Sequence, residues 1–209
     1  MRDGIVVADR LRSMAPRPLT AGAEVDAQLV ARARSGERAA FEELVRRHAD
    51  RLYAVVLGVC GDRQDAEEVT QEAFVRAWRS LERIEGRSQF FTWLYRIGVN
   101  EAKRRLGRRS TAPTLRSLDD EAIDVSDRSR GPHARAEERD LHQALRRAIL
   151  ELPFEYRMPL VLRDVEGLPT AQAAAIMELG EAAFKSRLHR ARLAVRAAVA
   201  DLVDPEGES

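Results

Sequence analysis

QFFTWLYRIGVNEAKRRLGRR, residues 89–109, decides how the rest of the chain is interpreted. Apolar side chains recur there near helical spacing and predict one helix with an apolar side: Phe90, Trp93, Leu94, Ile97 and Leu106. The stretch also carries six cations and a single acid, Glu101. The cations are Arg96, Lys103, Arg104, Arg105, Arg108 and Arg109. Unpaired DNA strands are bound by aromatic side chains that stack on the bases and by nearby cations that hold the phosphates. An aromatic half followed by a cationic half therefore suits DNA that has been opened. The alternative is a core helix with a solvated cationic end, because aromatic stripes on helices commonly pack inward.

Composition limits the class of protein. The 209 residues are 44% hydrophobic and 33% charged, enough for one large or two small domains. The net charge is only +1, so any nucleic-acid surface must come from how the charges are distributed. The lone Cys60 lies in an apolar run and predicts a buried small hydrophobe in a reducing compartment. With no apolar run of about 20 residues and no signal peptide, we expect a cytoplasmic protein without direct membrane insertion.

The N-terminal half predicts a helical domain over residues 24–109, after a disordered leader at 1–23. Asp26 is expected to cap a short helix ending at Arg34. A longer helix follows the i, i+3, i+4, i+7 pattern with Phe41, Leu44, Val45, His48, Leu52, Val55, Val56 and Val59. His48 lies on this apolar side without a second His or Cys at ligand spacing, so we interpret it as a core histidine and not a metal ligand.

The next helix begins at Asp62 or Asp65 and has an acidic first half. Acidic residues favour the positive end of a helix dipole, which accounts for some of them without any function. Glu68, Gln71 and Glu72, however, share one polar side of the helix with Arg79. That arrangement also suits a docking surface for a basic partner.

Residues 110–135 lack any hydrophobic period and predict a flexible linker, followed by a second domain at 136–203 and a tail at 204–209. Pro159 is expected to disturb a helix there. The helix at AQAAAIM, the turn at 178–180 and a last helix from Glu181 predict a helix-turn-helix. Cations project from the last helix: Lys185, Arg187, Arg190, Arg192 and Arg196. The predicted fold is all-α, with two small helical domains.

Four stretches in order, DAEEVTQEAFVRAW, FFTWLYRIGVNEAKRR, LPFEYRMPLVLRDVEGLP and FKSRLHRAR, resemble the extracytoplasmic function (ECF) sigma factors of bacterial RNA polymerase. The resemblance covers roughly Asp26 to Leu202. It implies that Glu68, Gln71 and Glu72 bind the clamp helices of the polymerase β′ subunit. It also implies a factor that recognises -10 and -35 promoter elements and promotes DNA melting.

The resemblance also assigns DNA contacts residue by residue. It places melting on residues 89–96 and a pocket for a flipped -10 base in the 82–88 loop. The implied -10 contacts are Phe90, Arg96, Asn100, Lys103 and Arg104. The implied -35 contacts are Lys185, Ser186, Arg187, His189 and Arg190. Many relatives carry Gly where this chain has Glu178, so we expect some strain in that turn.

The resemblance implies control by an anti-sigma factor. The near-zero net charge, with cationic DNA surfaces balanced by acidic segments, also predicts that the free chain adopts compact arrangements in which its basic surfaces are partly masked. Two other classes of protein are possible interpretations of the sequence. A stand-alone helix-turn-helix regulator leaves the Glu68–Glu72 side and the aromatic helix without a role. An enzyme lacks support, since no nucleophile motif, phosphate loop or metal spacing is present, and we expect no catalytic residue, metal or cofactor.

Overall fold

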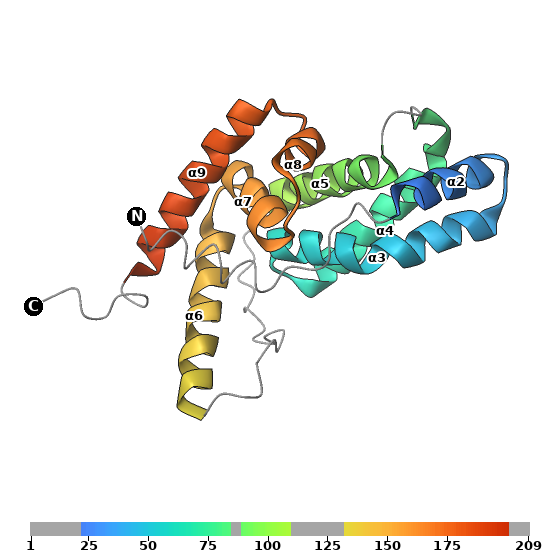
Figure 1. Ribbon diagram of the computed structural model, residues 1–209. Coiled ribbons are helices and arrows are strands. Elements are labelled where there is room, and N and C mark those ends of the chain that lie inside the picture. The colour runs from blue at the N-terminus through green and yellow to red at the C-terminus, as the bar shows by residue number, and fades with distance from the viewer. Residues whose placement is uncertain (1–21, 85–88, 110–131, 201–209) are drawn as a thin grey trace, which may run out of the picture.

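The computed structural model describes residues 22–84, 89–109 and 132–200, and the predicted leader, linker and tail lie almost entirely outside these ranges. The first domain consists of α2 (Ala23–Arg34), α3 (Arg38–Cys60), α4 (Arg63–Arg79), the short 3-10 turn η1 (Leu81–Arg83) and α5 (Phe90–Arg109). Helix α3 packs against α2, α4 and α5 (Figure 1). It ends at Gly61, whose φ of 72° favours glycine, and the Asp62 side chain accepts a bond from the Asp65 amide to cap α4.

The second domain consists of α6 (Pro132–Glu151), α7 (Phe154–Leu160), the π-helical turn η2 (Val161–Val165), α8 (Thr170–Ile176) and α9 (Glu181–Ala198). Helix α6 begins four residues before the predicted boundary at Ala136. A proline is well tolerated in a first helical turn because its missing N–H would have no partner there. No strand occurs in the described ranges, and the all-α fold prediction is confirmed.

The sequence predicted that Asp26 caps α2, and this prediction is wrong. Gly22 occupies the N-cap without a side-chain bond, and Asp26 lies one turn inside the helix. Its carboxylate instead contacts His48 Nε2 at 2.8 Å and accepts a bond from Arg47 Nε at 2.9 Å. His48 is therefore a buried histidine with a polar partner, which confirms its interpretation as a core residue.

Pro159 lies inside α7, directly before the chain widens into the π-helical turn η2. Because proline removes one backbone donor and its ring crowds the preceding turn, regular α-helix is disfavoured at this point. The wider turn ends with the Glu166 amide donating to the Val161 carbonyl and the Leu168 amide donating to the Leu162 carbonyl. The expected disturbance is thus present, and it leads the chain into α8.

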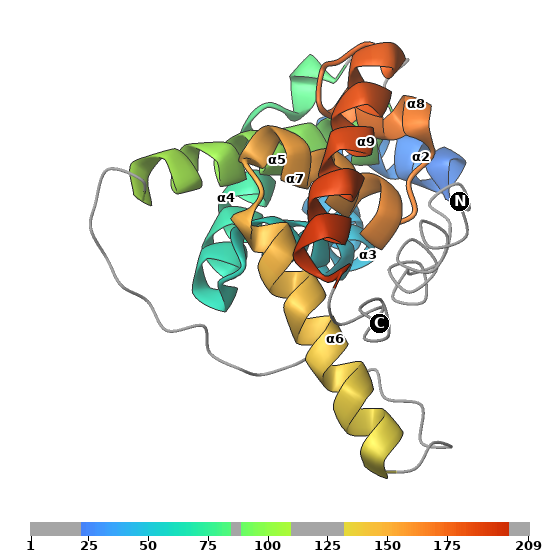
Figure 2. The ribbon, with the colours of Figure 1, turned by 90° about the vertical axis from the view of Figure 1, so that its left-hand side faces the viewer.

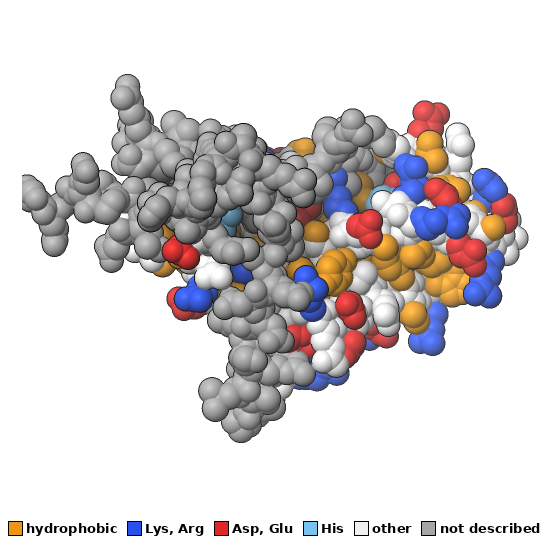
Figure 3. Space-filling view, turned by 90° about the horizontal axis from the view of Figure 1, so that it is seen from below, with side chains coloured by type: hydrophobic (Ala, Val, Ile, Leu, Met, Phe, Trp, Pro, Cys, Tyr) orange, Lys and Arg blue, Asp and Glu red, His pale blue; other side chains and the backbone are white. Residues whose placement is uncertain are grey.

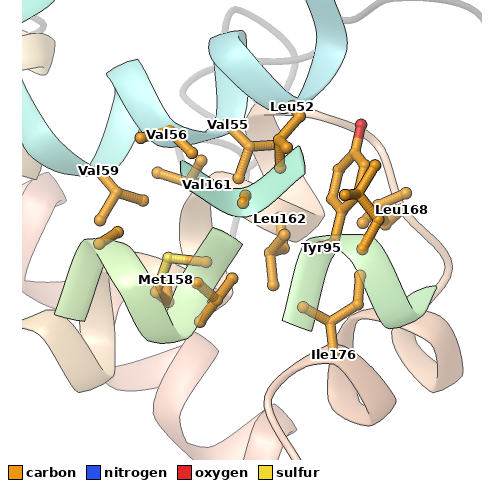
Figure 4. Packing of buried hydrophobic residues seen from close by; sticks show 14 of the residues in the cluster. Leu52, Val55, Val56, Val59, Tyr95, Met158, Val161, Leu162, Leu168 and Ile176 are labelled. Atoms are coloured by element: carbon orange, nitrogen blue, oxygen red, sulfur yellow. The ribbon is translucent and has the colours of Figure 1, made fainter. Parts of the chain in front are cut away.

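The two halves share one continuous hydrophobic core. Helix α3 contacts α6, α7 and η2, and α5 contacts α8. Figure 4 shows Val55 and Val56 of α3 beside Val161, and Tyr95 of α5 beside Leu168 and Ile176. Tyr95 is fully buried, and its hydroxyl has no hydrogen-bond partner among the described residues. The close packing of the two domains was not predicted in this detail.

Arg51 and Arg157 bond to backbone carbonyls across this domain interface. Arg51 Nη2 of α3 donates to the Glu166 carbonyl at 2.9 Å, and Arg51 Nε lies 3.5 Å from the Glu166 carboxylate. Arg157 Nη1 of α7 donates to the Val59 carbonyl at 2.5 Å, close to the C-terminal end of α3. Both guanidinium groups therefore connect the second domain to the long helix of the first.

Stability should depend on pH through Glu166. Burial raises the pKa of Glu166 to about 7 although the nearby Arg51 lowers it, whereas the ordinary value is 4.5. The folded protein thus holds a proton between about pH 4.5 and 7 that the unfolded chain releases, so this stabilisation is complete below pH 4.5 and is lost as pH rises through 7. We expect a loss on the order of 2–3 kcal/mol.

The measurement is urea unfolding between pH 5 and 8 for the wild type and Glu166→Gln. Arg51 and Tyr95 are the ionisable groups that act on Glu166 or respond to it. Arginine and tyrosine side chains do not ordinarily titrate between pH 5 and 8, and burial raises the pKa of Tyr95 further, so the glutamine variant should show the flatter profile. Parallel profiles for the two proteins would contradict the assignment.

Candidate nucleic-acid and partner interfaces

The predicted docking side of α4 lies at the surface. Gln71 and Glu68 are exposed, Glu72 is half-buried, and Arg79 is exposed at the far end. Val75 and Trp78, each 42% exposed, add apolar area to the same helix. Figure 3, seen from below, shows hydrophobic side chains among acidic and basic ones on the first domain. This mixed surface has the composition of a protein-binding surface with an acidic side.

The carboxylates of α4 are held by cations of α4 and α5. Arg105 Nη1 lies 2.5 Å from Glu68, and its Nη2 lies 2.8 Å from the buried Asp65. Arg76 bridges Glu72 at 2.8 Å and the buried Glu101 of α5 at 2.9 Å. The docking side of α4 is therefore linked by ion pairs to the cationic half of α5, which the sequence did not predict.

The aromatic half of α5 is mainly core. Phe90, Phe91 and Tyr95 are buried, and Trp93 is half-buried. Phe90 lies between the rings of His48 and Trp93, with centroids 5.3 and 6.1 Å away. In this arrangement the core interpretation of the aromatic stripe holds for these three buried rings. Phe90, a predicted contact of -10 DNA, is only 4% exposed in this arrangement.

The polar -10 candidates on α5 lie in different environments. Asn100 and Lys103 are exposed. Arg104 is exposed too and forms an ion pair with Glu101. Arg96 is half-buried, and its Nη1 lies 3.2 Å from the Glu178 carboxylate in the other domain. Its Nε is buried and has no hydrogen-bond partner among the described residues. Arg96 thus forms an ion pair with the second domain.

The segment before α5 is fixed where the structure describes it. Arg34 at the end of α2 donates to the Glu82 carbonyl at 3.1 Å and to the Ile84 carbonyl at 3.5 Å. Ile84 is itself buried. Residues 85–88 of the predicted base pocket lie outside the described ranges.

Helix α9 separates an apolar side from a cationic one. Phe184, Leu188, Ala191 and Val195 are buried. Four of the -35 candidates, Lys185, Ser186, His189 and Arg190, are exposed, and Arg187 is half-buried. Figure 2 shows α9 on the side of the molecule nearest the viewer, away from α2. The helix can therefore present these side chains outward while its apolar side stays packed.

One cation of α9 has a structural contact instead. Arg192 makes two bonds, at 2.6 and 2.8 Å, to the buried carboxylate of Asp164 in η2. This bidentate pair holds α9 against the π-helical turn. The charge count along the last helix therefore overstates the positive charge that is free to bind DNA.

The helix-turn-helix turn contains the strain that the sequence predicted. Glu178 has a φ of 54°, the only positive value among the described non-glycine residues. A left-handed conformation costs a non-glycine residue roughly 1–2 kcal/mol. The half-exposed ion pair with Arg96 offsets at most about 1 kcal/mol of that cost.

Comparison with known families now identifies the class of protein. Residues 44–111 match the model of Sigma-70 region 2, and residues 142–195 match the model of Sigma-70, region 4. These regions correspond to the α3–α5 segment and to the helix-turn-helix domain, so the chain is a sigma factor of the sigma-70 type. Within that class it belongs to the ECF sigma factors, as its curated relatives show.

Two relatives and two solved structures illustrate the likeness. The RNA polymerase sigma-H factor of Pseudomonas aeruginosa is 34% identical over 189 residues, covering 86% of this chain and 96% of the relative. The ECF RNA polymerase sigma-E factor of Escherichia coli K12 is 35% identical over 186 residues, covering 85% and 96%. CnrH in complex with the cytosolic domain of CnrY is 30% identical, with a TM-score of 0.61 and coverage of 87% and 99%. RpoE of Bartonella quintana, solved with the anti-sigma factor NepR, has a TM-score of 0.60 at 22% identity over 77% and 96%, which supports the fold alone.

Proposed function

We propose that this chain binds core RNA polymerase through α4, recognises -35 DNA through α9 and -10 DNA through α5, and promotes melting between them. The observation that carries the proposal is the exposed cationic side of α9, which stays accessible while its apolar side is packed. The exposed acidic side of α4 supports a separate docking surface. In this role the chain has no catalytic site and needs no cofactor, and it acts in the cytoplasm with the polymerase.

Control by a protein partner is part of the proposal. CnrH, which shares the fold at 30% identity, was solved with the cytosolic domain of CnrY bound. We infer that an anti-sigma factor binds this chain in a similar way. None of the described helices is long and apolar enough to cross a bilayer.

The double substitution Glu68→Ala with Glu72→Ala tests polymerase docking. We expect at least a tenfold loss of affinity for core polymerase, because charged pairs at an interface can each contribute more than 1.4 kcal/mol. Both side chains are about 45% exposed, at 45% and 44%, so stability should change little. Affinity is measured by fluorescence titration with core enzyme.

The matched control is Glu24→Ala in α2 with Glu155→Ala in α7, two exposed acids away from α4. It removes the same number of negative charges as the Glu68 and Glu72 variant and should bind the polymerase normally. Unchanged affinity in the Glu68 and Glu72 variant, or an equal loss in both variants, would remove the docking assignment.

Arg190→Ala tests the -35 surface. Arg190 is exposed, and its Nη1 reaches the Tyr156 hydroxyl only at the long distance of 3.5 Å, so its removal should leave the fold intact. If Arg190 reads a base, we expect a loss of roughly 1–3 kcal/mol confined to one base pair. If it binds a phosphate, the loss should be uniform, with a shallower salt dependence.

Holoenzyme binding to promoters altered one base pair at a time distinguishes these outcomes. Arg147→Ala, an exposed arginine on α6, is the control for the loss of one positive charge. Promoter binding by Arg190→Ala that equals the wild type would exclude Arg190 from the DNA surface.

A further inference from the structure

The domain contact affects the two promoter-binding surfaces unequally. On α5, Tyr95 is fully buried and lies beside Leu168 and Ile176 of the second domain (Figure 4). The next residue, Arg96, forms the ion pair with Glu178 at 3.2 Å. The helix-turn-helix turn and α8 therefore contact α5 at Tyr95 and Arg96, inside the segment where melting is expected.

The -35 surface is not covered in the same way. Lys185, Ser186, His189 and Arg190 are all exposed. The polar contacts of Lys185 and Arg190 are with Glu181 and Tyr156, which belong to the second domain itself. The views in Figures 1 and 2 agree that α9 lies on the outside of the molecule, and α8 contacts both α9 and α5. Among the described residues, the closed arrangement thus leaves the cationic side of α9 accessible.

The backbone of the turn supports a specific contact. Glu178 has a left-handed backbone conformation, which is unfavourable for a residue with a side chain. Its carboxylate forms the ion pair with Arg96. The Arg96 Nε is buried without a partner, so the guanidinium is only partly satisfied in the closed form. An arginine of this kind can exchange its carboxylate for a DNA phosphate when the domains separate.

We propose that the free chain is closed at its -10 surface only: the helix-turn-helix turn covers Tyr95 and holds Arg96 through Glu178, while the -35 helix remains available. The proposal rests on the proposed function of α5 and α9. Duplex DNA can then bind α9 first, and single-stranded DNA binds α5 only after the domains separate. The sequence predicted that both basic surfaces are partly masked, and the described contacts narrow this to the -10 surface.

The test uses the full chain and two fluorescent probes of random sequence, a 20-nucleotide single strand and a 20-base-pair duplex. Glu178→Gln, Arg96→Gln and the double variant form a cycle with the wild type. We expect Glu178→Gln to raise affinity for the single strand about two- to fivefold, the size expected of a half-exposed ion pair. In the Arg96→Gln background the same substitution should have no such effect.

The cycle distinguishes release of the Arg96–Glu178 contact from a general effect of charge. The loss of a negative charge alone would raise affinity equally in both backgrounds and for both probes. An equal gain in both backgrounds overturns the proposal, and hydrogen exchange decides what the absence of any gain means. Glu155→Gln, an exposed acid on α7, is the control for charge alone.

Hydrogen exchange distinguishes failure of this proposal from failure of the proposed function. Glu178→Gln should speed exchange in residues 90–99 and 174–179 relative to the wild type at least about twofold. Unchanged exchange shows that the contact does not form in the free chain and overturns the proposal. Faster exchange with unchanged binding of the single strand shows that the contact forms but that α5 does not bind single strands, which overturns the function assigned to α5.

Discussion

Gly58→Phe is expected to separate the two domains without unfolding either one. A Cβ built at Gly58 meets only the two methyl groups of Val161, at 3.2 and 3.6 Å, so the space around it is bounded by the other domain. A phenyl ring there cannot be accommodated by small shifts. Overpacking costs typically 1–3 kcal/mol even for added methylenes. Since 1.4 kcal/mol is a factor of ten, the ratio of closed to open protein should fall by a factor of about 5 to 150.

Small-angle scattering and circular dichroism together measure this result. We expect a larger radius of gyration with unchanged helical content. Gly58→Ala is the matched control, because its single methyl group needs a shift of only a few tenths of an ångström and alanine favours the helix by about 1 kcal/mol. A Gly58→Phe protein with native dimensions and stability would show that the α3 contact with Val161 does not exist in solution.

The separated domains should also bind single-stranded DNA more tightly in the absence of polymerase. Affinity for a probe is reduced by the fraction of protein that is competent to bind, and opening raises that fraction. The gain in affinity for single-stranded DNA should therefore be larger for Gly58→Phe than for Glu178→Gln, because Gly58→Phe disrupts apolar packing whereas Glu178→Gln removes one half-exposed ion pair.

Arg157→Ala is expected to be the most destabilising single substitution of a polar residue in the second domain. The guanidinium donates to the carbonyls of Val59, Leu150 and Leu152, which lie at the ends of α3 and α6. Burial lowers the pKa of Arg157, and the partial negative charge at two helix ends favours its charged form. Its removal leaves these carbonyls without their charged donor.

We expect a loss of about 2–4 kcal/mol in the free energy of unfolding, given a cost of about 1–3 kcal/mol for each buried group left unsatisfied. For a chain of this size that loss corresponds to a decrease in Tm of roughly 5–15 °C. Arg157→Lys should recover only part of the stability, since an ammonium cannot reproduce the planar fork of donors. The exposed Arg147→Ala is the control, and an equal decrease in both alanine variants would contradict the role assigned to Arg157.

Periodicity and local chemistry in the sequence determined most of the secondary structure. The apolar pattern along α3 predicted its buried side, from Phe41 to Val59, including the buried His48. The choice of Asp62 or Asp65 for the start of α4 was resolved as Asp62. The strain at Glu178 was also predicted, because the preference against left-handed backbone is a property of the residue itself.

Sequence reasoning identified the polar sides of α4 and α9 but could not assign their partners. Spacing along one helix determines which side chains share a face, whereas an ion pair depends on which other helix faces them. The bonds of Arg192 to Asp164 and of Arg105 to Glu68 therefore emerged only from the packing. The same limit explains Asp26, whose partner His48 lies 22 residues away and outweighs local capping.

The sequence by itself thus determined a helical chain with a helix-turn-helix, an acidic helix and an aromatic-cationic helix, because these depend on interactions within a few residues. Only the tertiary structure decided that the two domains share a core and that Arg96 meets Glu178 across it. Those contacts join residues more than 70 positions apart, and local sequence patterns do not distinguish one domain arrangement from another. Burial of apolar area on α3 and α5 selects the closed one.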